Sequence, residues 1–353
     1  MKLVSIIVPV YNRVGAIELC YDSLIRQTYK NIEIIFVDDG STDDTLSVLN
    51  SFKDERVLVI HQDNAGPSEA RRVGFNHSKG EYILFIDSDD TIDEDFTNKL
   101  VMTIEKTNAS ISCGRIGLHV NYPIIKNIIF KAKKKPEEIY LSKNKEYLPA
   151  LHQGIVGKLF KREILELKKN TFRANEDLIV MYPLFAKVDH LAYDNKAIYH
   201  NYYSKNSQRN LLFGYKFMTI YNTFGTLSKL IDEYKKLSLY DEYYLELEML
   251  FIRNIFERIN NLESSVNNRE YFYKFVSLLL LYLEYYFPDW RVNPYYLEDY
   301  SLGEITDRLR IRNASRIIKK VNYKSEKLSL EEIYDRYKLL EKDYEENILK
   351  LVK

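Results

Sequence analysis

The sequence predicts an α/β fold in which helices flank a mostly parallel sheet, followed by a C-terminal α-helical domain. In the first hundred residues, short apolar runs alternate regularly with segments of helical periodicity, the pattern of βαβ units. From about residue 211 onward, apolar and aromatic residues recur at helical spacing. The chain of 353 residues has room for about two domains. We therefore expect domains at 1–210 and 211–353.

The elements of the first domain follow one another in a regular order. Four buried strands are expected at residues 3–10, 32–37, 57–60 and 82–86. Helices are expected around residues 17–24, 43–52 and 68–76, and from residue 93 onward. After residue 110 the pattern loosens, and it predicts a short strand at 155–160, a helix from Lys161 and a helix at about 176–186.

The second domain is predicted from apolar stripes, of which the last runs from Ile333 to Leu351 at close to heptad spacing. We expect this stripe to pack on its own domain, and a homodimer through the C-terminal helices is the alternative. Residues 308–327 contain eight basic residues and one acidic residue, Glu326. Such a segment could lie on an anionic membrane surface, although most charged runs are solvated faces.

Composition excludes several classes of protein. Lys plus Arg equals Asp plus Glu, at 51 each, so no overall charge would recruit nucleic acid. Cys20 and Cys113 lie in apolar contexts and are expected to be reduced core residues, which fits a cytoplasmic protein. The chain runs from Met1 directly into a strand, without the layout of a signal peptide. We expect a cytoplasmic location, with peripheral contact at the inner face of the cell membrane left open.

The strand at 82–86 ends in the sequence Asp87-Ser88-Asp89-Asp90. Carboxylates gathered at one strand end repel each other unless a positive charge lies among them. Mg²⁺ or Mn²⁺ would supply it, because these cations prefer oxygen ligands and commonly bind phosphate oxygens as well. The alternative is that Asp89, Asp90 or Thr91 caps the following helix.

Polar residues also follow the other three strands, and the carboxyl edge of such a sheet is where ligands bind. The residues concerned are Pro9, Tyr11 and Asn12 after the first strand, Asp39 after the second, Asn64, Gly66 and Arg71 after the third, and Asp87 and Ser88 after the fourth. Together they supply an aromatic face, carboxylate acceptors, a cation and a metal ligand. This combination suits a nucleoside diphosphate, although each piece alone could be an ordinary turn.

The segments at 5–12, 37–43, 64–71 and 85–90 resemble those of family 2 glycosyltransferases, which have the Rossmann-like GT-A fold. The resemblance covers about residues 1–205. It implies a nucleotide-sugar half at 1–110 and an acceptor half at 111–210. It also implies roles for four residues: Tyr11 would stack on uracil, Asp39 would accept from the uracil N3–H, Asp87 would lie by the ribose, and Asp89 would bind the metal.

The later signature of that family is a short strand that runs into a lysine, followed by a Glu-Asp pair that opens a helix. Lys158, Glu176 and Asp177 match it, which makes Asp177 the implied catalytic base. The alternative is that Glu176 and Asp177 only favour a helix N-terminus electrostatically. His200 stands where the family has Tyr or Arg; it could complete the metal shell, or it could be a satisfied strand histidine.

The leading hypothesis is a metal-dependent, inverting glycosyltransferase. It would move one hexosyl or N-acetylhexosaminyl group from a UDP-sugar to a glycan, lipid-linked or glycoprotein acceptor of the bacterial surface. A nucleotidyltransferase is disfavoured because no Gly-rich loop follows the first strand, and a processive synthase because no Gln-x-x-Arg-Trp motif is present. A non-catalytic module that binds sugar nucleotides remains the alternative.

Overall fold

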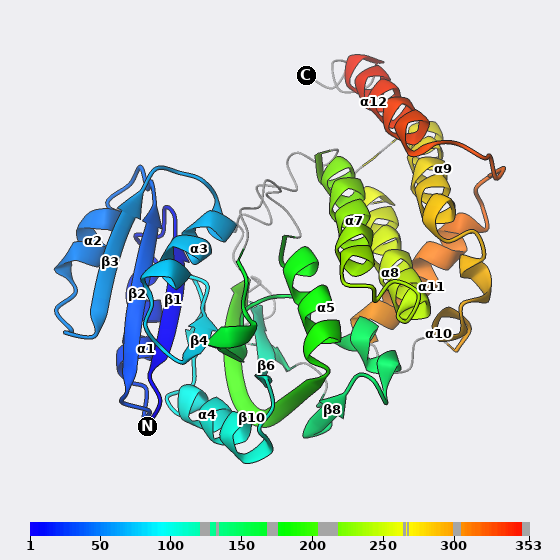
Figure 1. Cartoon of the computed structure of the whole chain (residues 1–353). Helices are drawn as coiled ribbons and strands as arrows, with labels where there is room; N and C mark the ends of the chain where they lie inside the picture. Colours follow the sequence, from blue (N-terminus) through cyan, green and yellow to red (C-terminus); the bar gives the residue numbers. More distant parts are fainter. Residues whose placement is uncertain are drawn as a thin grey trace. The chain divides into compact units, whose positions relative to one another are not determined.

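The structure is a computed structural model that divides into two compact units (Figure 1). It describes residues 1–120, 128–131, 134–167, 176–203, 218–263, 266, 268–298 and 305–347. The first unit comprises residues 1–144 and 152–207, and the second comprises 145–151 and 208–353. The short segment 145–151 therefore groups with the second unit, whereas the sequence places it within 1–210.

The first unit is built on one sheet with the strand order β3-β2-β1-β4-β9-β6-β10-β5. The strands along this path are β3 (Val57–Gln62), β2 (Ile32–Asp39), β1 (Val4–Val10), β4 (Tyr82–Phe85), β9 (Lys158–Lys161), β6 (Ile111–Val120), β10 (His190–Tyr203) and β5 (Thr91–Ile92). Strands β7 (Ile128–Lys131) and β8 (Glu138–Tyr140) pair with β6 and β10. Every residue of β1 is buried, as expected for a strand covered on both faces.

The sheet is parallel among β1 to β4 and between β6 and β10, as predicted, and it is antiparallel at its other pairings. Strands β3, β2, β1 and β4 run parallel to one another, and β10 is parallel to β6. Strand β9 lies between β4 and β6 and is antiparallel to both, and β5, β7 and β8 also pair antiparallel. The sheet is therefore mixed, and the four strands that come first in the chain, β1 to β4, form a parallel group at one end of it.

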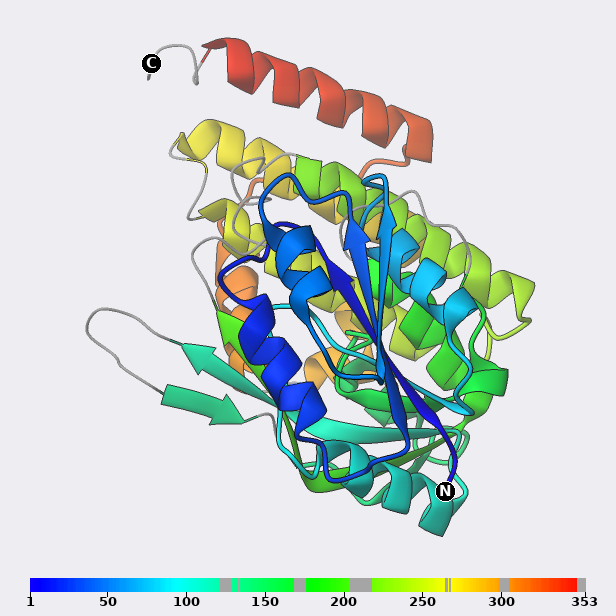
Figure 2. The ribbon, with the colours of Figure 1, turned by 90° about the vertical axis from the view of Figure 1, so that its left-hand side faces the viewer.

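Helices cover both faces of this parallel part. Helices α1 (Ile17–Ile25) and α2 (Thr45–Ser51) lie on one face, and α3 (Pro67–His77) lies on the other (Figure 2). Helix α3 packs very close to β1, because a Cβ added at Gly74 would lie 2.5 Å from Ile7 Cγ2. This close approach brings the side chain of Arg71 toward the carboxyl ends of the strands.

The remaining helices of the first unit are α4 (Phe96–Thr107) and α5 (Glu176–Val188). The helix predicted from Lys161 is only a three-residue 3₁₀ turn at Arg162–Ile164. Its first residue is tied to the start of β4, since Arg162 donates a backbone hydrogen bond to Glu81 O and a side-chain bond to Gly80 O. These bonds hold the segment against the sheet edge, and Leu165 returns to an extended conformation.

The second unit is helical and has an aromatic core. Its main helices are α7 (Met218–Lys236), α8 (Tyr244–Glu263), α9 (Arg269–Tyr286), α10 (Pro294–Leu297), α11 (Ile305–Ile318) and α12 (Leu330–Asn347). Phe224 of α7 stacks on Tyr282 of α9 with ring centroids 4.1 Å apart, and the Tyr282 hydroxyl donates to Phe224 O. Tyr337 of α12 is fully buried and contacts both Phe224 and Phe275. The described part of the stripe, which includes Ile333, Tyr337 and Tyr344, thus packs on its own unit, and its end at Leu351 lies outside the described residues.

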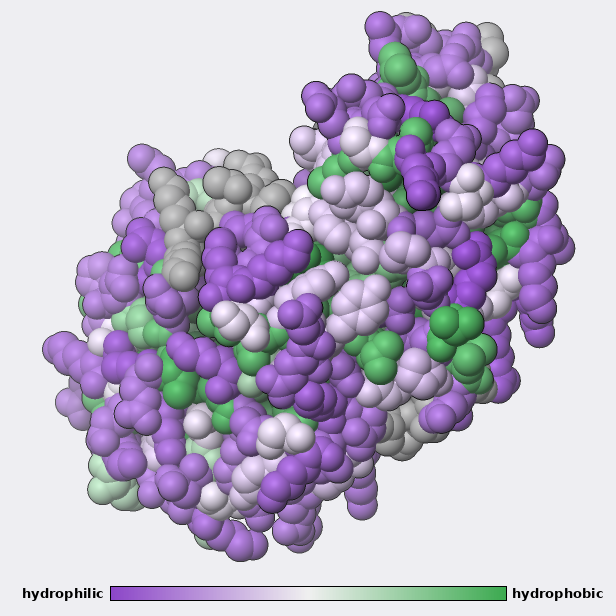
Figure 3. All heavy atoms as spheres, turned by 45° about the vertical axis from the view of Figure 1, so that its right-hand side comes forward, coloured by the Kyte–Doolittle hydropathy of each residue, from purple (hydrophilic) through white to green (hydrophobic). Residues whose placement is uncertain are grey.

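Two further features concern the surface of the molecule and the apolar character of its helices in the described ranges. On the face shown in Figure 3, hydrophilic residues predominate, and hydrophobic residues lie among them in small groups. No helix in the described ranges combines the length and the apolar composition that crossing a bilayer requires.

Candidate active site

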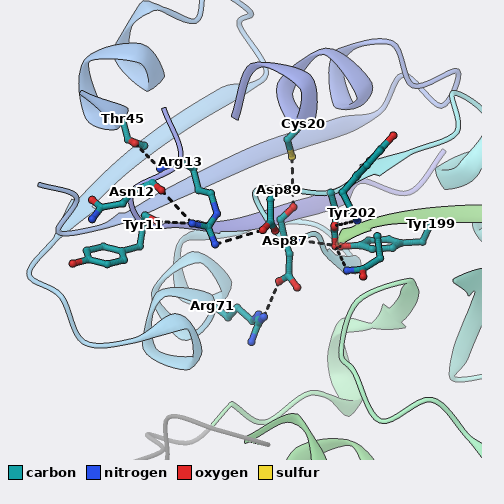
Figure 4. Close-up of polar contacts among 12 residues, drawn as sticks. Tyr11, Asn12, Arg13, Cys20, Thr45, Arg71, Asp87, Asp89, Tyr199 and Tyr202 are labelled. Carbon is teal, nitrogen blue, oxygen red and sulfur yellow. Dashed lines mark hydrogen bonds and ion pairs between the residues drawn. The ribbon is translucent and has the colours of Figure 1, made fainter. Parts of the chain in front are cut away.

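The loop after β1 is locked to the loop after β2 through Asn12. Asn12 adopts a left-handed backbone conformation, with φ +51°. Its N–H donates to Ser41 Oγ at 3.0 Å, and its Oδ1 accepts from the N–H of Thr42 at 2.8 Å. Pro9 is buried within β1, and Tyr11 is half-buried beside Asn12 (Figure 4). Asn12 therefore fixes the path of the chain on which Tyr11 is presented.

Asp39, at the end of β2, holds the loop that precedes α3. Its Oδ1 accepts from Gln62 Nε2 at 2.7 Å and from the N–H of Ala65 at 2.8 Å, and its Oδ2 accepts from the N–H of Gly66 at 2.9 Å. Asn64 in turn donates to the backbone carbonyl of Asp39 at 2.9 Å. Since a carboxylate offers about four acceptor positions, one position on Oδ2 remains for a ligand. The predicted contact with a base N–H is compatible with this geometry.

Gly66 then starts α3 with a positive φ of +94°, a conformation that glycine adopts without steric cost. Pro67 follows at the first helical position, where its missing N–H is not needed. The sequence Gly66-Pro67 therefore sets the direction in which α3 leaves the sheet edge, and with it the position of Arg71 one turn later.

Two arginines reach the carboxylates that follow β4 (Figure 4). Arg71 Nη2 lies 2.8 Å from Asp87 Oδ1, and Arg13 Nη2 lies 3.5 Å from Asp89 Oδ2. Burial raises the pKa of the Asp89 carboxyl; Arg13 opposes this shift, and the charge of Asp87 adds to it. Ser88, between them, is buried.

Asp90 has a structural role. It accepts hydrogen bonds from the Tyr199 hydroxyl (2.7 Å), from Asn201 Nδ2 (2.9 Å) and from the N–H of Tyr202 (3.0 Å). Burial, together with the charge of Asp87, raises the pKa of Asp90 to about 7. The alternative reading of Asp89, Asp90 or Thr91 as a helix cap is wrong. Helix α4 begins at Phe96 after Asp95, because Thr91 and Ile92 form β5.

Asp177, in the first turn of α5, reaches the same arginine. Its Oδ1 accepts from Arg71 Nη1 at 3.4 Å, and its Oδ2 accepts from the N–H of Ile155 at 3.1 Å. Arg71 therefore contacts both Asp87 and Asp177, which lie 90 residues apart in the sequence. Glu176 starts α5, and its side chain lies outside the described residues.

Lys158 is buried at the start of β9. Its Nζ donates to Gly154 O at 2.5 Å and to Val156 O at 3.4 Å. Burial lowers the pKa of Lys158 below its usual value. The two carbonyl bonds make it a support for the 154–157 turn, and a direct contact with the nucleotide sugar stays a prediction.

Both ring nitrogens of His200 are engaged by protein groups. Nδ1 lies 2.7 Å from His119 Nε2, and Nε2 lies 2.8 Å from Asp93 Oδ1. His119 also stacks on Tyr202. These contacts favour the satisfied strand histidine, since His200 would have to give up one of them to bind a metal.

Sequence reasoning missed Arg13 and the pair formed by Asp38 and His61. Besides contacting Asp89, Arg13 donates from its N–H to Thr45 Oγ1 at 2.8 Å and from Nη1 to Asn12 O at 3.1 Å. His61 Nδ1 lies 2.6 Å from Asp38 Oδ2, and Asp38 is fully buried. Arg13 could have been predicted from its position directly after Tyr11 and Asn12, at a strand end where the sequence predicts ligand binding.

A divalent cation fits this site only with ligands from elsewhere. Within the described ranges, no three His, Cys, Asp or Glu side chains are gathered closely enough to hold a metal. The Asp89 carboxylate is partly buried beside a second carboxylate, an environment that a cation would relieve. Mg²⁺ and Mn²⁺ commonly complete their shells with phosphate oxygens and water. One protein carboxylate together with a diphosphate is therefore a sufficient donor set.

Most of the residues described above lie in a stretch of sequence that matches one protein family. The model of glycosyl transferase family 2 matches residues 5–166, which include the ends of β1 to β4 and strand β9. This part of the chain belongs to glycosyl transferase family 2. The family assignment agrees with the resemblance read from the sequence.

Two curated relatives illustrate the extent of the match. Over 113 residues, 31% of this chain, the sequence is 46% identical to glycosyltransferase GlyA of Streptococcus pneumoniae serotype 4. Over 264 residues, 72% of this chain, it is 29% identical to the poly(ribitol-phosphate) beta-glucosyltransferase of Bacillus spizizenii. The chain spans 16% and 40% of the lengths of these two relatives.

A solved structure matches nearly the whole chain. Residues 1–349 of TarS from S. aureus, in complex with UDP, superpose with a TM-score of 0.61 at 18% identity, covering 98% of this chain and 92% of that chain. At this identity the likeness establishes the fold alone. The GT-A fold with a C-terminal helical region is thereby confirmed.

Proposed function

We propose that this chain is a metal-dependent, inverting glycosyltransferase that moves one sugar from a UDP-sugar to a hydroxyl of a bacterial surface glycan. The acceptor would belong to a capsule, an exopolysaccharide, a teichoic acid or a glycoprotein. The observation that carries the proposal is the position of Arg71, within hydrogen-bonding distance of both Asp87 and Asp177. It joins the carboxylates after β4, on the donor side, to the first turn of α5, on the acceptor side.

The donor side has groups for each part of a nucleoside diphosphate. Tyr11 offers a half-exposed ring, and Asp39 keeps one acceptor position on Oδ2 beside the N–H groups of the 65–66 loop. Asp87, with a side chain that is 36% exposed, is open to a ribose hydroxyl. Arg13 and Arg71 supply positive charge where the diphosphate would lie. The UDP bound to TarS, which shares this fold, supports the choice of nucleotide.

On the acceptor side, Asp177 is the proposed general base. Its Oδ2 is oriented by the N–H of Ile155, its Oδ1 faces Arg71, and its side chain is 26% exposed. As Asp177 takes the proton of an acceptor hydroxyl, that oxygen attacks the anomeric carbon, and the bond from this carbon to the β-phosphate oxygen breaks. UDP leaves with the bonding electrons, and attack from the opposite face inverts the anomeric centre.

Asp89 is the residue proposed to hold Mg²⁺ or Mn²⁺, with diphosphate oxygens as the other ligands. A divalent cation bound there would neutralise the charge that builds on the departing UDP. Arg13 holds the Asp89 side chain in place through the contact at 3.5 Å. The name of the Bacillus spizizenii relative supports a polyol-phosphate glycan as one acceptor to test.

The test is UDP release from a panel of UDP-sugars, with Mn²⁺ or Mg²⁺ and with a chelator. We expect slow hydrolysis of one donor without any acceptor, and loss of this activity both with the chelator and in Asp89→Ala. With an acceptor present, Asp177→Asn should lower kcat by about 10²–10⁴-fold. It should leave donor binding nearly unchanged, because Asn still offers an acceptor to the N–H of Ile155.

Absence of turnover and of metal-dependent binding across the whole panel would contradict the proposal. Metal-dependent binding of one UDP-sugar without turnover, with any acceptor of these four classes, would instead favour a module that binds sugar nucleotides.

A further inference from the structure

An open groove lies between α10 and α11 in the second unit, with a volume of about 410 Å³. Tyr296, Leu297, Ile311, Arg312, Ser315, Arg316 and Lys319 line it. Three of these seven residues are basic and none is acidic. None of these lining residues belongs to the site described above, and their chemistry suits a negatively charged ligand.

Neighbouring elements hold the walls of the groove in place. Asn293 caps α10 by accepting from the N–H groups of Tyr295 and Tyr296, and its Nδ2 donates to the buried Glu248 of α8 at 2.6 Å. Tyr296 packs against Trp290, with ring centroids 5.4 Å apart, and its hydroxyl lies 3.2 Å from Ser315 Oγ. On the other wall, Asn260 of α8 donates to Arg310 O at 2.9 Å. Both walls are therefore anchored to α8.

The basic side of the groove continues along the chain. Arg316 and Lys319 are exposed, and neither forms an ion pair or a side-chain hydrogen bond with the protein in the described ranges. Lys320, Lys324 and Lys327 follow and are also exposed. The only acidic residue between 308 and 327, Glu326, is paired with Arg336 at 2.8 Å. The surface around the groove thus has positive charge that the protein itself does not neutralise.

Exposed apolar side chains stand beside these cations. Leu297, in the groove wall, is 65% exposed, Val292 is 69% exposed, and Leu309 is 59% exposed. Leu309 precedes Arg312 by three residues and Arg316 by seven, so it shares their face of α11. Binding of a soluble polyanion would leave these leucines exposed to water. Leucines among unneutralised cations are instead typical of a surface that lies at the headgroup boundary of an anionic bilayer.

We propose that the groove between α10 and α11 is a docking site for anionic phospholipid. A headgroup phosphate binds beside Arg316 and Lys319, and Leu297 and Leu309 enter the boundary between headgroups and acyl chains. The charge complementarity of the surface selects the lipid, and the walls anchored on α8 make the site preformed. Docking there would hold the second unit at the surface of a membrane.

The experiment measures binding of the full chain to vesicles of phosphatidylcholine with and without phosphatidylglycerol. We expect binding only when phosphatidylglycerol is present, and weaker binding as salt increases. The double variant Arg316→Gln/Lys319→Gln should bind roughly 25-fold more weakly, about fivefold for each cation lost. Leu297→Ser should also weaken binding, and that loss should persist at high salt.

The matched control is Lys338→Gln/Lys342→Gln. It removes two exposed cations of α12 and so changes the net charge by the same amount as the groove variant. It should bind vesicles within twofold of the unaltered chain. Donor hydrolysis without vesicles, measured in parallel, should be the same for both double variants, so a failure of the proposed activity would be seen separately from a failure of docking.

Three results would overturn the proposal. The first is equal binding to vesicles with and without phosphatidylglycerol. The second is an equal loss of vesicle binding in the groove and control variants. The third is that Arg316→Gln/Lys319→Gln abolishes binding of a soluble phosphate-bearing glycan while vesicle binding is unaffected. The last result would assign the groove to an acceptor polymer.

Discussion

The hydroxyl of Tyr199 should be one of the most sensitive single atoms in the first unit. It donates to Asp90 Oδ2 at 2.7 Å and accepts from the N–H of Asp87 at 3.1 Å, and the side chain is fully buried. Through these two bonds, β10 fixes the turn that presents Asp87 and Asp89. Tyr199→Phe removes only the hydroxyl and leaves the ring packing against Phe96 intact.

The expected loss of stability follows from the bonds that disappear. Asp90 keeps its hydrogen bonds from Asn201 and Tyr202. Loss of the bond from the Tyr199 hydroxyl should therefore cost about 1.5 kcal/mol, the low end of the range for hydrogen bonds to charged groups. The N–H of Asp87 is left without its partner, which costs about 1–3 kcal/mol when the group stays buried. The variant should therefore lose about 3 kcal/mol.

The measurement must report on the first unit alone. The single tryptophan, Trp290, belongs to the second unit, so its fluorescence cannot follow this loss. Amide hydrogen exchange of peptides from β4 and β10 can, because it gives the free energy of opening of each segment. We expect opening there to become easier by about 3 kcal/mol, while the Trp290 transition in urea barely changes.

Tyr202→Phe is the matched control. Its hydroxyl lies 3.3 Å from Thr91 Oγ1 and is exposed, whereas its backbone N–H still bonds Asp90. This variant should stay within about 0.5 kcal/mol of the unaltered chain. A loss below about 1 kcal/mol for Tyr199→Phe, or equal losses for both variants, would refute the view that Tyr199 holds the carboxylate turn.

Three other predictions test the packing, the buried lysine and the bridging arginine. Gly74→Ala should cost about 1–3 kcal/mol by overpacking against Ile7, whereas Gly15→Ala, with no atom within 4 Å of the added Cβ, should be neutral in the same exchange measurement. Burial lowers the pKa of Lys158, so its charged form costs stability at neutral pH. That cost fades as pH rises toward its ordinary pKa of 10.5, and the unaltered chain should gain stability relative to Lys158→Met over that range in urea titrations. Arg71→Lys should lower kcat/KM by about 10–100-fold because an ammonium cannot bridge two carboxylates as a guanidinium does, and Arg72→Lys, whose partner is Glu69, should stay within about twofold.

The sequence predicted the elements whose signal is local. Strands β1 to β4 and helices α1 to α3 lie within a few residues of their expected bounds, because each strand is a short apolar run with a turn or cap on either side. The antiparallel insertion of β9 between β4 and β6 was not predicted. Strand direction depends on pairing between residues 45 to 79 positions apart, and the local sequence pattern does not encode that pairing.

The same distinction applies to the site. The sequence predicted that Asp39, Arg71, Asp87 and Asp89 lie at one edge of the sheet because each is at or after a strand end that could be located, and the structure places them there. Arg13 was missed because its contact with Asp89 depends on the left-handed turn at Asn12, which redirects the chain after β1. The sequence left open whether His200 binds a metal or is a satisfied strand histidine. Its contacts with Asp93 and His119 depend on the pairing of β10 with β5 and β6, which the sequence does not reveal.

The charges of the site bear on why a metal would be needed at all. Among the described side chains, Arg13 and Arg71 contact three carboxylates, those of Asp87, Asp89 and Asp177. Asp90 is held by neutral donors, so no cation of the protein balances its charge in these contacts when it is ionised. Three carboxylates against two guanidinium groups leave an excess of negative charge among these contacts, and a diphosphate would add to it. A divalent cation at Asp89 would offset that excess where the leaving group forms, and it would leave Arg71 to position Asp177 against the acceptor.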